Sequence, residues 1–324
     1  MPLPHDLFKR LSALNRRHLD RHVTTGADLA SDAAAPADAA RDAARDADAD
    51  GPVTLETLIP GREREARGGR YWHVSRPAAD FLSPSPDAGA AEGDALDADA
   101  GASPASLAER YRHVLCGAGR TVGPDALHES LRPLVTAAPQ RLVYLDIETC
   151  GLAGEPIFLV GLLGWSAGGL HLAQFLARDY AEEGPMLAGA WQALADADCL
   201  VTYNGKTFDV PTLGARSLAC GLFDLPPCPE HVDLLPEARR RWKAVLPNCR
   251  LQTIEMAVCG RRRRGDVPGA DIPAAYHAFV RSRQSAAPRR RGRDLRRLQG
   301  ILHHNALDLL TLADLVTRLL AGEV

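Results

Sequence analysis

Two carboxylates stand two residues apart in Asp146-Ile147-Glu148, directly after the apolar run Leu142–Leu145. Side chains two apart on a strand point to the same face, and the sites of α/β proteins form at the carboxyl ends of strands. Two carboxylates held together there repel each other unless a cation lies between them. The spacing therefore indicates a cation-binding site, against the alternative of an exposed loop with two ordinary acids, which a lone Asp-x-Glu would favour.

Two further acids come later in the chain. Asp209 ends the segment Asn204–Asp209 and begins a predicted helix, where a carboxylate is commonly just a favourable partner for the helix dipole. Asp308 lies close to the apolar stripe of a long predicted helix, where a charge is costly unless it is paired or bound to a metal. His304, four residues earlier, shares the face of Asp308, whereas His303 points about 140° away in a regular helix.

The chemistry of these residue types is that of a hard metal site. Carboxylate oxygens suit Mg²⁺ or Mn²⁺ rather than zinc. Four acids around two such ions match the two-metal scheme for phosphodiester cleavage, and a His near the last acid could orient or deprotonate the attacking water.

The elements that must position these acids follow from the apolar pattern. Short apolar runs predict strands, and apolar residues at three- and four-residue spacing predict helices. The expected strands are 142–145, 157–163, 171–176, 199–203 and 232–235, and the expected helices are 181–196, 209–220 and 296–320. Three early strands followed by alternating helix and strand indicate an α/β fold, a mixed sheet flanked by helices. Residues 141–324 are long enough to form its core.

The front of the chain has a different composition. Apolar residues at helical spacing among Lys and Arg predict a short basic helix at 1–25, which would lie on a membrane surface or, as we favour, dock on this chain or a partner. Tracts rich in Ala and Asp at 26–52 and 83–107 predict a largely disordered N-terminal region of two linkers. A small strand-containing island is expected at 53–82, and one domain at 108–324.

The formal net charge of −3 over 324 residues says little, because the charges are unevenly spread. Residues 26–50 carry a balance of −5 (seven Asp, two Arg), whereas residues 239–297 carry +13 (17 Lys and Arg, four Asp and Glu). Seven Cys without a CxxC pair disfavour a zinc ribbon and a disulfide scaffold. The sequence shows neither a transmembrane run nor a signal-peptide core, which predicts a cytoplasmic protein with no membrane partner.

Two arginine clusters, Arg261–Arg264 and Arg289–Arg293, lie between Asp209 and Asp308. Such runs can neutralise phosphates, but they are also expected as solvated loops in a chain with 35 Arg and only three Lys. Beside a metal-dependent site, phosphate contact is favoured. The aromatic stretch Tyr276–Phe279 between the clusters could stack on bases, although core packing is at least as well supported.

Three motifs together resemble those of the DEDD exonucleases, which have the ribonuclease-H-like fold. Leu145–Leu152 resembles their first motif, Asn204–Asp209 the second and His304–Asp308 the third, in the same order and at similar spacing. The chain is more closely similar to the bacterial YprB-like branch of predicted exonucleases. That similarity rests on His231–Leu234, Leu251–Glu255, Asp266–Gly269 and Ile272-Pro273.

The resemblance implies a metal-dependent nuclease, more finely a 3′–5′ exonuclease, that uses two Mg²⁺ or Mn²⁺ ions on DNA or RNA. Its metal-binding acids would be Asp146, Glu148, Asp209 and Asp308. His304 would lie near the attacking water. The better-studied exonucleases carry a Tyr four positions before the last Asp or a His five before it, so His303 stays an alternative.

Further roles follow from the same resemblance. The substrate-binding residues would be Thr149, Leu152, Asn204, Lys206 and Phe208. Asp233, His303 and Asn305 would support the site from behind, and Asn204 with Asp233 would hold the edge of the sheet. Protein partners are not indicated.

Two other classes of function stay open. One is a nucleic-acid-binding module with a vestigial nuclease site, against which the presence of all four acids argues. The other is a structural or partner-binding domain that contacts no nucleic acid. A measurement of affinity at low and high salt separates these two, because charge-driven binding weakens steeply as salt rises.

Overall fold

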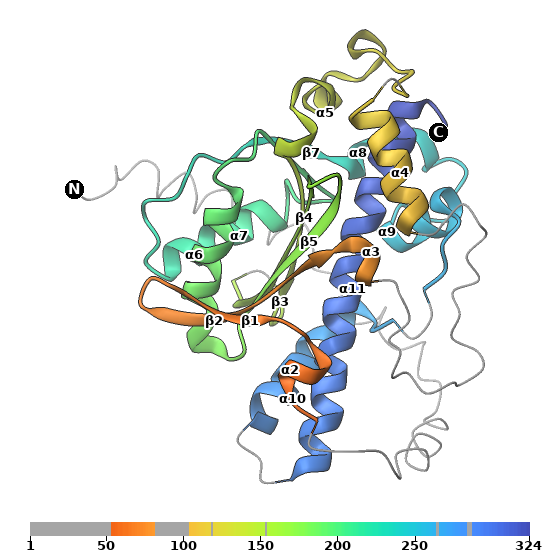
Figure 1. The fold of residues 1–324 in the computed structure, drawn as a ribbon. Helices are drawn as coiled ribbons and strands as arrows, with labels where there is room; N and C mark the ends of the chain where they lie inside the picture. Colours follow the sequence, from red (N-terminus) through yellow and green to blue (C-terminus); the bar gives the residue numbers. More distant parts are fainter. Residues whose placement is uncertain (1–52, 82–103, 118, 153, 264–265, 284–286) are drawn as a thin grey trace, which may run out of the picture. The chain divides into compact units, whose positions relative to one another are not determined.

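The computed structural model describes residues 53–81, 104–117, 119–152, 154–263, 266–283 and 287–324 (Figure 1). The basic helix expected at 1–25, the linker at 26–52 and most of the linker at 83–107 lie outside these residues. The last four residues of that second linker already belong to helix α4 (Pro104–Leu115), so the helix begins earlier than the expected domain boundary at 108.

A mixed sheet forms the centre of the described chain, in the strand order β1-β2-β5-β4-β3-β6-β7. The strands are β1 (Arg62–Ala66), β2 (Gly69–Pro77), β3 (Leu142–Thr149), β4 (Ile157–Ser166), β5 (Gly169–Leu176), β6 (Cys199–Thr202) and β7 (Glu230–Asp233). Along this order, the neighbouring pairs β1-β2, β2-β5, β5-β4 and β4-β3 are antiparallel. The pairs β3-β6 and β6-β7 are parallel. The fold class expected from the apolar pattern, a mixed α/β sheet flanked by helices, is confirmed.

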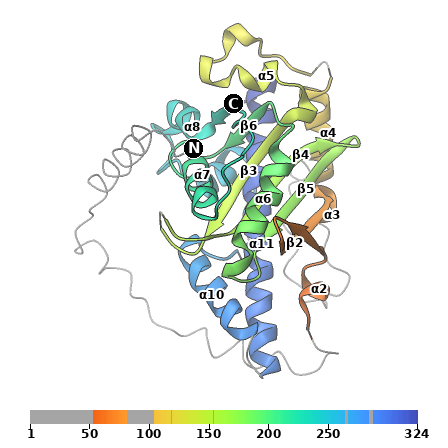
Figure 2. The same ribbon diagram turned by 90° about the vertical axis from the view of Figure 1, so that its left-hand side faces the viewer.

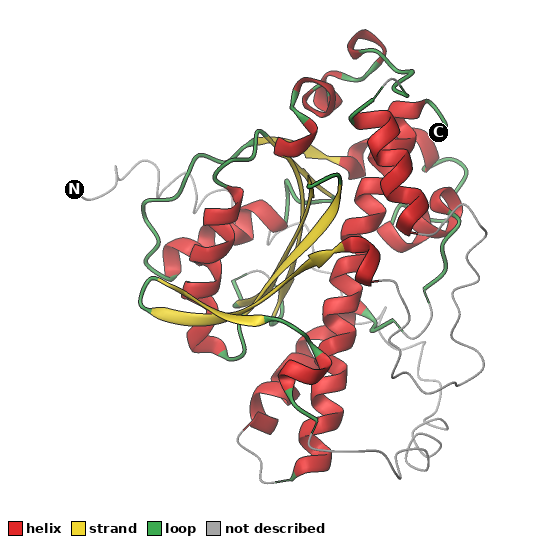
Figure 3. Cartoon of the chain, viewed as in Figure 1, coloured by secondary structure: helices red, strands yellow, loops and turns green. Residues whose placement is uncertain are grey.

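Helices cover both faces of this sheet (Figures 2 and 3). Helix α6 (Glu183–Leu194) packs against β1, β2, β4 and β5, with α7 (Asp209–Ala219) beside it. Helix α11 (Pro288–Ala321) crosses β3 and β4 on the opposite face and packs against α4. The buried apolar side chains form two clusters, and α11 contributes to both, with Leu298 in one and Leu312 in the other.

Helix α11 is 34 residues long and begins eight residues before the expected helix at 296–320. Pro288 occupies its first turn, and Gly322 ends it with a left-handed φ of 70°, as is common at helix ends. The early turns hold the arginines at 289–293, whose polar side chains give no apolar periodicity, so the sequence pattern could not reveal them. This cluster is therefore helical, and the interpretation as a solvated loop is wrong for it.

The segment 53–82, expected as a small island, contributes two strands to the same sheet. Strand β2 pairs with β5, and β1 forms the outer edge of the sheet. The indole of Trp72 donates to Ile59 O at 3.1 Å, and Gln299 of α11 donates to Leu58 O at 2.8 Å. Strand β1 was not expected because its sequence, Arg-Glu-Arg-Glu-Ala, has no apolar face.

Short helices complete the described chain. They are α2 (Leu55–Leu58), α3 (Ala78–Phe81), α5 (Pro133–Thr136), α8 (Leu234–Trp242), α9 (Leu251–Ile254), the π-helical turn η6 (Glu255–Cys259), α10 (Ile272–Arg283) and the 3-10 turns η2 (Pro124–Ala126), η3 (Glu129–Leu131), η4 (Pro139–Arg141), η5 (Tyr180–Glu182) and η7 (Gly269–Asp271). Among the described helices, none is long and apolar enough to span a bilayer. The seven cysteines, all within the described residues, are free thiols.

Candidate active site

Asp146 and Glu148 lie on one face of β3, at the end of the strand that has β4 on one side and β6 on the other. Burial raises the pKa of Asp146 well above its ordinary value, and the charges of the neighbouring acids Asp308, Glu148 and Asp209 raise it further. Burial likewise raises the pKa of Glu148 to about 8. The two carboxylates therefore lie within electrostatic reach of Asp209 and Asp308.

Asp209 is the first residue of α7 and is 5% exposed. Burial raises its pKa to about 7, although backbone N–H groups of Asp209 itself and of Ile147 lower it in part. The contact with Ile147 places this carboxylate between Asp146 and Glu148 along the strand. A Cβ atom on Gly205 would lie 2.2 Å from Thr202 Oγ1, so only glycine fits the tight turn that aims Asp209 back at the sheet.

Asp308 and His304 lie one turn apart on α11 and face each other, with 3.4 Å between His304 Nε2 and Asp308 Oδ2. Burial opposes charge on both, but hydrogen bonds to Asp266 and Asp308 raise the pKa of His304 to about 11. The hydrogen bond with His304 and the charge of Arg263 hold the pKa of Asp308 below its ordinary value despite burial. Burial lowers the pKa of His303. Of the two histidines, His304 is the one in contact with Asp308.

Asn305 ties the helix to the strand. It is fully buried, and its Nδ2 donates to Asp146 Oδ2 at 2.8 Å and to Asp146 O at 3.2 Å. Its Oδ1 accepts from Nε2 of buried Gln174 at 2.9 Å. Because the oxygen of the Asn305 amide accepts from Gln174, the nitrogen of the same amide faces Asp146. Asn305 therefore contacts Asp146 from α11, and the supporting role that the resemblance implies for it stays a prediction.

Asp233 supports the turn of the second motif. Its carboxylate accepts from the backbone N–H of Asn204 at 2.8 Å and of Lys206 at 3.1 Å, and it caps α8 by accepting from Leu235 N at 3.0 Å. This capping ends β7 at Asp233, two residues before the expected end of the strand at 235. Asn204 adopts a left-handed φ of 68°, and its Oδ1 accepts from Thr207 Oγ1 at 2.7 Å.

A cavity of about 390 Å³ opens beside the acids. Four sequence-predicted residues line it: Glu148, Thr149, Leu152 and Phe208. Leu152 is 87% exposed at its rim, an unusual state for a large apolar side chain. Asn204 and Lys206 are exposed and do not line it, so the structure brings together three of the five predicted substrate contacts.

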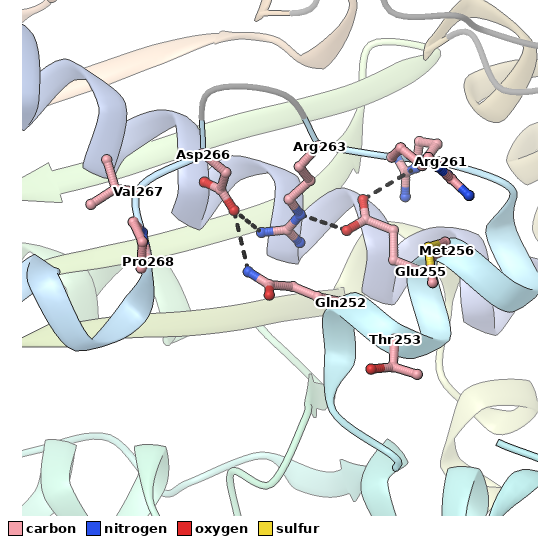
Figure 4. Close-up of a pocket in the computed structure, with 10 residues that line it drawn as sticks. Gln252, Thr253, Glu255, Met256, Arg261, Arg263, Asp266, Val267 and Pro268 are labelled. Carbon is pink, nitrogen blue, oxygen red and sulfur yellow. Dashed lines mark hydrogen bonds and ion pairs between the residues drawn. The ribbon is translucent and has the colours of Figure 1, made fainter. Parts of the chain in front are cut away.

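Asp266, Arg263 and Glu255 also lie at this site, and the sequence did not indicate them as site residues (Figure 4). Both oxygens of Asp266 lie within hydrogen-bonding distance of His304 Nδ1, at 2.9 and 3.0 Å. Arg263 donates to Asp308, to Asp266 at 3.2 Å and to Glu255 at 2.5 Å. In the sequence Arg263 is one of four consecutive arginines, and no local signal distinguishes it from its neighbours.

The other basic and aromatic residues are divided between core and surface. Arg261 is 10% exposed and donates to Thr311 at 3.1 Å, whereas Arg262 is exposed. Tyr276 is fully buried and stacks on Phe158 with ring centroids 3.9 Å apart. Of the alternatives for the aromatic stretch 276–279, core packing therefore holds for Tyr276, and also for Phe279, which is 5% exposed.

The donor set at this site fits hard cations. Oxygen donors predominate, and three acids have pKa values raised by burial, which a bound cation would reverse. Within the described residues, no three or more His, Cys, Asp or Glu side chains stand in metal-holding geometry. The types of donor atom therefore fit a divalent cation, whereas their present arrangement does not form a complete site, because Asp308 faces Arg263 and His304.

Sheet order, flanking helices and converging acids define a ribonuclease-H-like protein with a nuclease-like site. The chain belongs to the RNase_H superfamily, whose model matches residues 143–320. Nucleases of this fold generally use divalent metal ions.

The uncharacterized protein YprB of Bacillus subtilis (strain 168) is 37% identical to this chain over 180 residues. The match covers 54% of this chain and 40% of YprB, so the chain spans well under two thirds of that relative. The resemblance to a YprB-like family is confirmed. Among solved structures, a family B DNA polymerase from the hyperthermophilic archaeon Pyrobaculum calidifontis matches with a TM-score of 0.41 and 18% identity, over 56% of this chain and 25% of the polymerase.

Proposed function

We propose that the chain is a metal-dependent 3′–5′ exonuclease that hydrolyses phosphodiester bonds of DNA or RNA with two Mg²⁺ or Mn²⁺ ions. One observation carries the proposal: acids from β3, α7 and α11 converge, and three of them have pKa values raised by burial. Asp146, Glu148, Asp209 and Asp308 would hold the ions. When bound, these would activate water and stabilise the leaving oxygen.

The remaining residues position the substrate and the water. The cavity beside Glu148 is of a size for one nucleotide, and Phe208 and exposed Leu152 offer it apolar surface for the terminal base. A pocket for one nucleotide next to the acids supports cleavage at a strand end rather than within a strand. His304 lies between Asp266 and Asp308, with Nδ1 2.9 Å from Asp266 Oδ1 and Nε2 3.4 Å from Asp308 Oδ2, and beside Asp308 it would lie near the attacking water.

An end-labelled substrate tests the proposal directly. Single-stranded DNA and RNA labelled at the 5′ end, incubated with Mn²⁺, should give a ladder of products shortened from the 3′ end. The ladder should vanish with EDTA. Absence of cleavage of every single- and double-stranded substrate with either ion would refute the proposal, and internal fragments from a circular substrate would refute its exonuclease part.

A second candidate is a nucleic-acid-binding module without turnover. The observation that favours it is the pairing of Asp308 with Arg263 and His304, beside the lack of a metal-holding group of three or more His, Cys, Asp or Glu among the described residues. Nucleic-acid binding that EDTA does not change, with no products, would establish this candidate instead.

The first turns of α11 should carry part of the affinity for nucleic acid. Arg289, Arg290, Arg291, Arg293, Arg296 and Arg297 are exposed there. Cations at a helix N-terminus oppose the helix dipole, and neighbouring like charges repel each other, so this cluster lowers stability unless an anion binds it.

Replacing Arg296 and Arg297 by Gln should therefore weaken binding and lessen its salt dependence. For single strands the slope of log affinity against log salt should fall by about 1.4, or about 0.7 per lost phosphate contact. Fluorescence anisotropy at several salt concentrations measures this slope. The matched control replaces Arg112 and Arg132, exposed arginines of α4 and of the residue before α5, and should leave the slope unchanged. Equal slopes for the two double variants would contradict the prediction.

A further inference from the structure

Arg263 is a buried cation at the back of the site, 7% exposed. Its Nε lies 2.5 Å from Glu255 Oε2, its Nη1 lies 3.2 Å from Asp266 Oδ2, and its Nη2 donates to Asp308 Oδ1. A guanidinium buried so deeply is costly unless acceptors surround it, and these three carboxylates supply them. This placement is specific, because the neighbouring Arg262 is exposed.

The residues that hold Arg263 form a support separate from α11. Glu255 is 1% exposed and begins the π-helical turn η6, which Gly260 ends with a left-handed φ of 70°. After Gly260 the chain lines the pocket shown in Figure 4, where Glu255 lies on one side of Arg263 and Asp266 on the other. The carboxylates of Glu255 and Asp266 therefore fix the plane of the guanidinium group that contacts Asp308.

The contact with Asp308 leaves that carboxylate free to bind a further cation. A carboxylate has about four acceptor positions, two on each oxygen. Arg263 uses Oδ1, and His304 faces Oδ2. One position on each oxygen stays available, and the charge of Arg263 is shared among three acids. A planar fork also fixes orientation, which a flexible ammonium group does not.

We propose that Arg263 is a positioning residue that orients the carboxylate of Asp308 as a metal ligand, with Glu255 as its anchor. The inference rests on the proposed function, because it assigns Asp308 to a divalent cation. It gives Arg263, one arginine of the run 261–264, a role inside the site that differs from phosphate contact. Removing the fork should loosen Asp308 without changing which acids are present.

The Arg263→Lys variant tests this, because it keeps the charge and loses the planar fork. Replacing a residue that hydrogen-bonds to a metal ligand typically lowers metal affinity by about 10- to 100-fold. We expect the affinity of the Arg263→Lys variant for Mn²⁺ to fall within this range. Electron paramagnetic resonance of free Mn²⁺, titrated into the full chain without nucleic acid, measures it. The control Arg262→Lys, at the exposed neighbour, should bind Mn²⁺ as the parent does.

A second variant covers the case in which Arg263→Lys fails to fold. Glu255→Gln removes the anchor but neither Arg263 nor any proposed metal ligand, and it should weaken Mn²⁺ binding by several-fold with an unchanged circular dichroism spectrum. A parent chain that binds Mn²⁺ and degrades nucleic acid, with folded variants of unchanged affinity, would overturn the inference alone. A parent chain that binds no Mn²⁺ would overturn the proposed function as well.

Discussion

Replacing Asp146 by Asn is expected to abolish nuclease activity and to stabilise the metal-free protein. A metal ligand stabilises the transition state by several kcal/mol, so activity should fall by roughly three orders of magnitude. The same carboxylate is buried beside three other acids, and its pKa is raised well above its ordinary value. Removing its charge relieves repulsion, and each kcal/mol gained should raise Tm in EDTA by about 2–4 °C.

The stability of the metal-free parent should also depend on pH in a defined direction. Folding raises the pKa of Asp209 from 3.8 to about 7 and that of Glu148 from 4.5 to about 8. Between these values the folded state holds more protons than the unfolded chain, so stability falls as pH rises from about 4 to about 8. Saturating Mn²⁺ should reverse the trend, because it favours the charged carboxylates.

Thermal unfolding in EDTA and in Mn²⁺, at pH 5.5 and pH 8, measures both effects. The control Asp125→Asn changes an exposed acid and should alter neither activity nor the dependence on pH. An Asp146→Asn protein that melts below its parent in EDTA at pH 8 would show that Asp146 is a structural acid. In that case the four acids would not form a repulsive cluster that needs a cation.

The sequence indicated the four acids but not Arg263 or Asp266, two of the residues that contact Asp308 and His304. Asp146 and Glu148 follow from a period of two on a strand, and Asp308 follows from the face of a helix, because both are local regularities. Asp266 and Arg263 reach the site through a chain reversal after η6, and no periodicity describes such a path. The run of four arginines made them look equivalent, whereas burial separates Arg263 from exposed Arg262.

Strand pairing is the other part that local patterns could not supply. Apart from β1, the strands of the sheet were expected individually, but their register was not. In that register Asp146 lies beside Gly161 of β4, and Gly161 lies beside Gln174 of β5. Asn305 of α11 lies over this row and hydrogen-bonds to both Asp146 and Gln174. Gly161 therefore belongs to the site although its sequence context is that of an ordinary apolar strand.

The Gly161→Ala variant is expected to be both unstable and nearly inactive. A Cβ atom there would lie 2.1 Å from Asn305 Oδ1 and 2.7 Å from its Cγ, well inside van der Waals contact. Asn305 is fully buried between its two partners, so it has little room to move. Overpacking of this kind costs about 1–3 kcal/mol, and displacing a partner of a metal ligand costs about 10- to 100-fold in activity.

Gly164→Ala, three residues along the same strand, is the matched control. A Cβ atom there meets only Leu142 O, at 3.9 Å, which is an ordinary contact. Thermal unfolding and the nuclease assay should separate the two variants clearly. The double variant Gly161→Ala with Asn305→Ala makes room for the new methyl group but removes the donor to Asp146, so it should recover stability without recovering activity.

Equal behaviour of Gly161→Ala and Gly164→Ala would contradict this account of Asn305. Recovery of activity in the double variant would contradict it in a different way, because Asp146 would then not need the amide. Loss of activity that persists after stability returns is the expected result. It would show that a glycine outside every motif sets the position of the first acid, by leaving space for the side chain of Asn305, which joins α11 to β3.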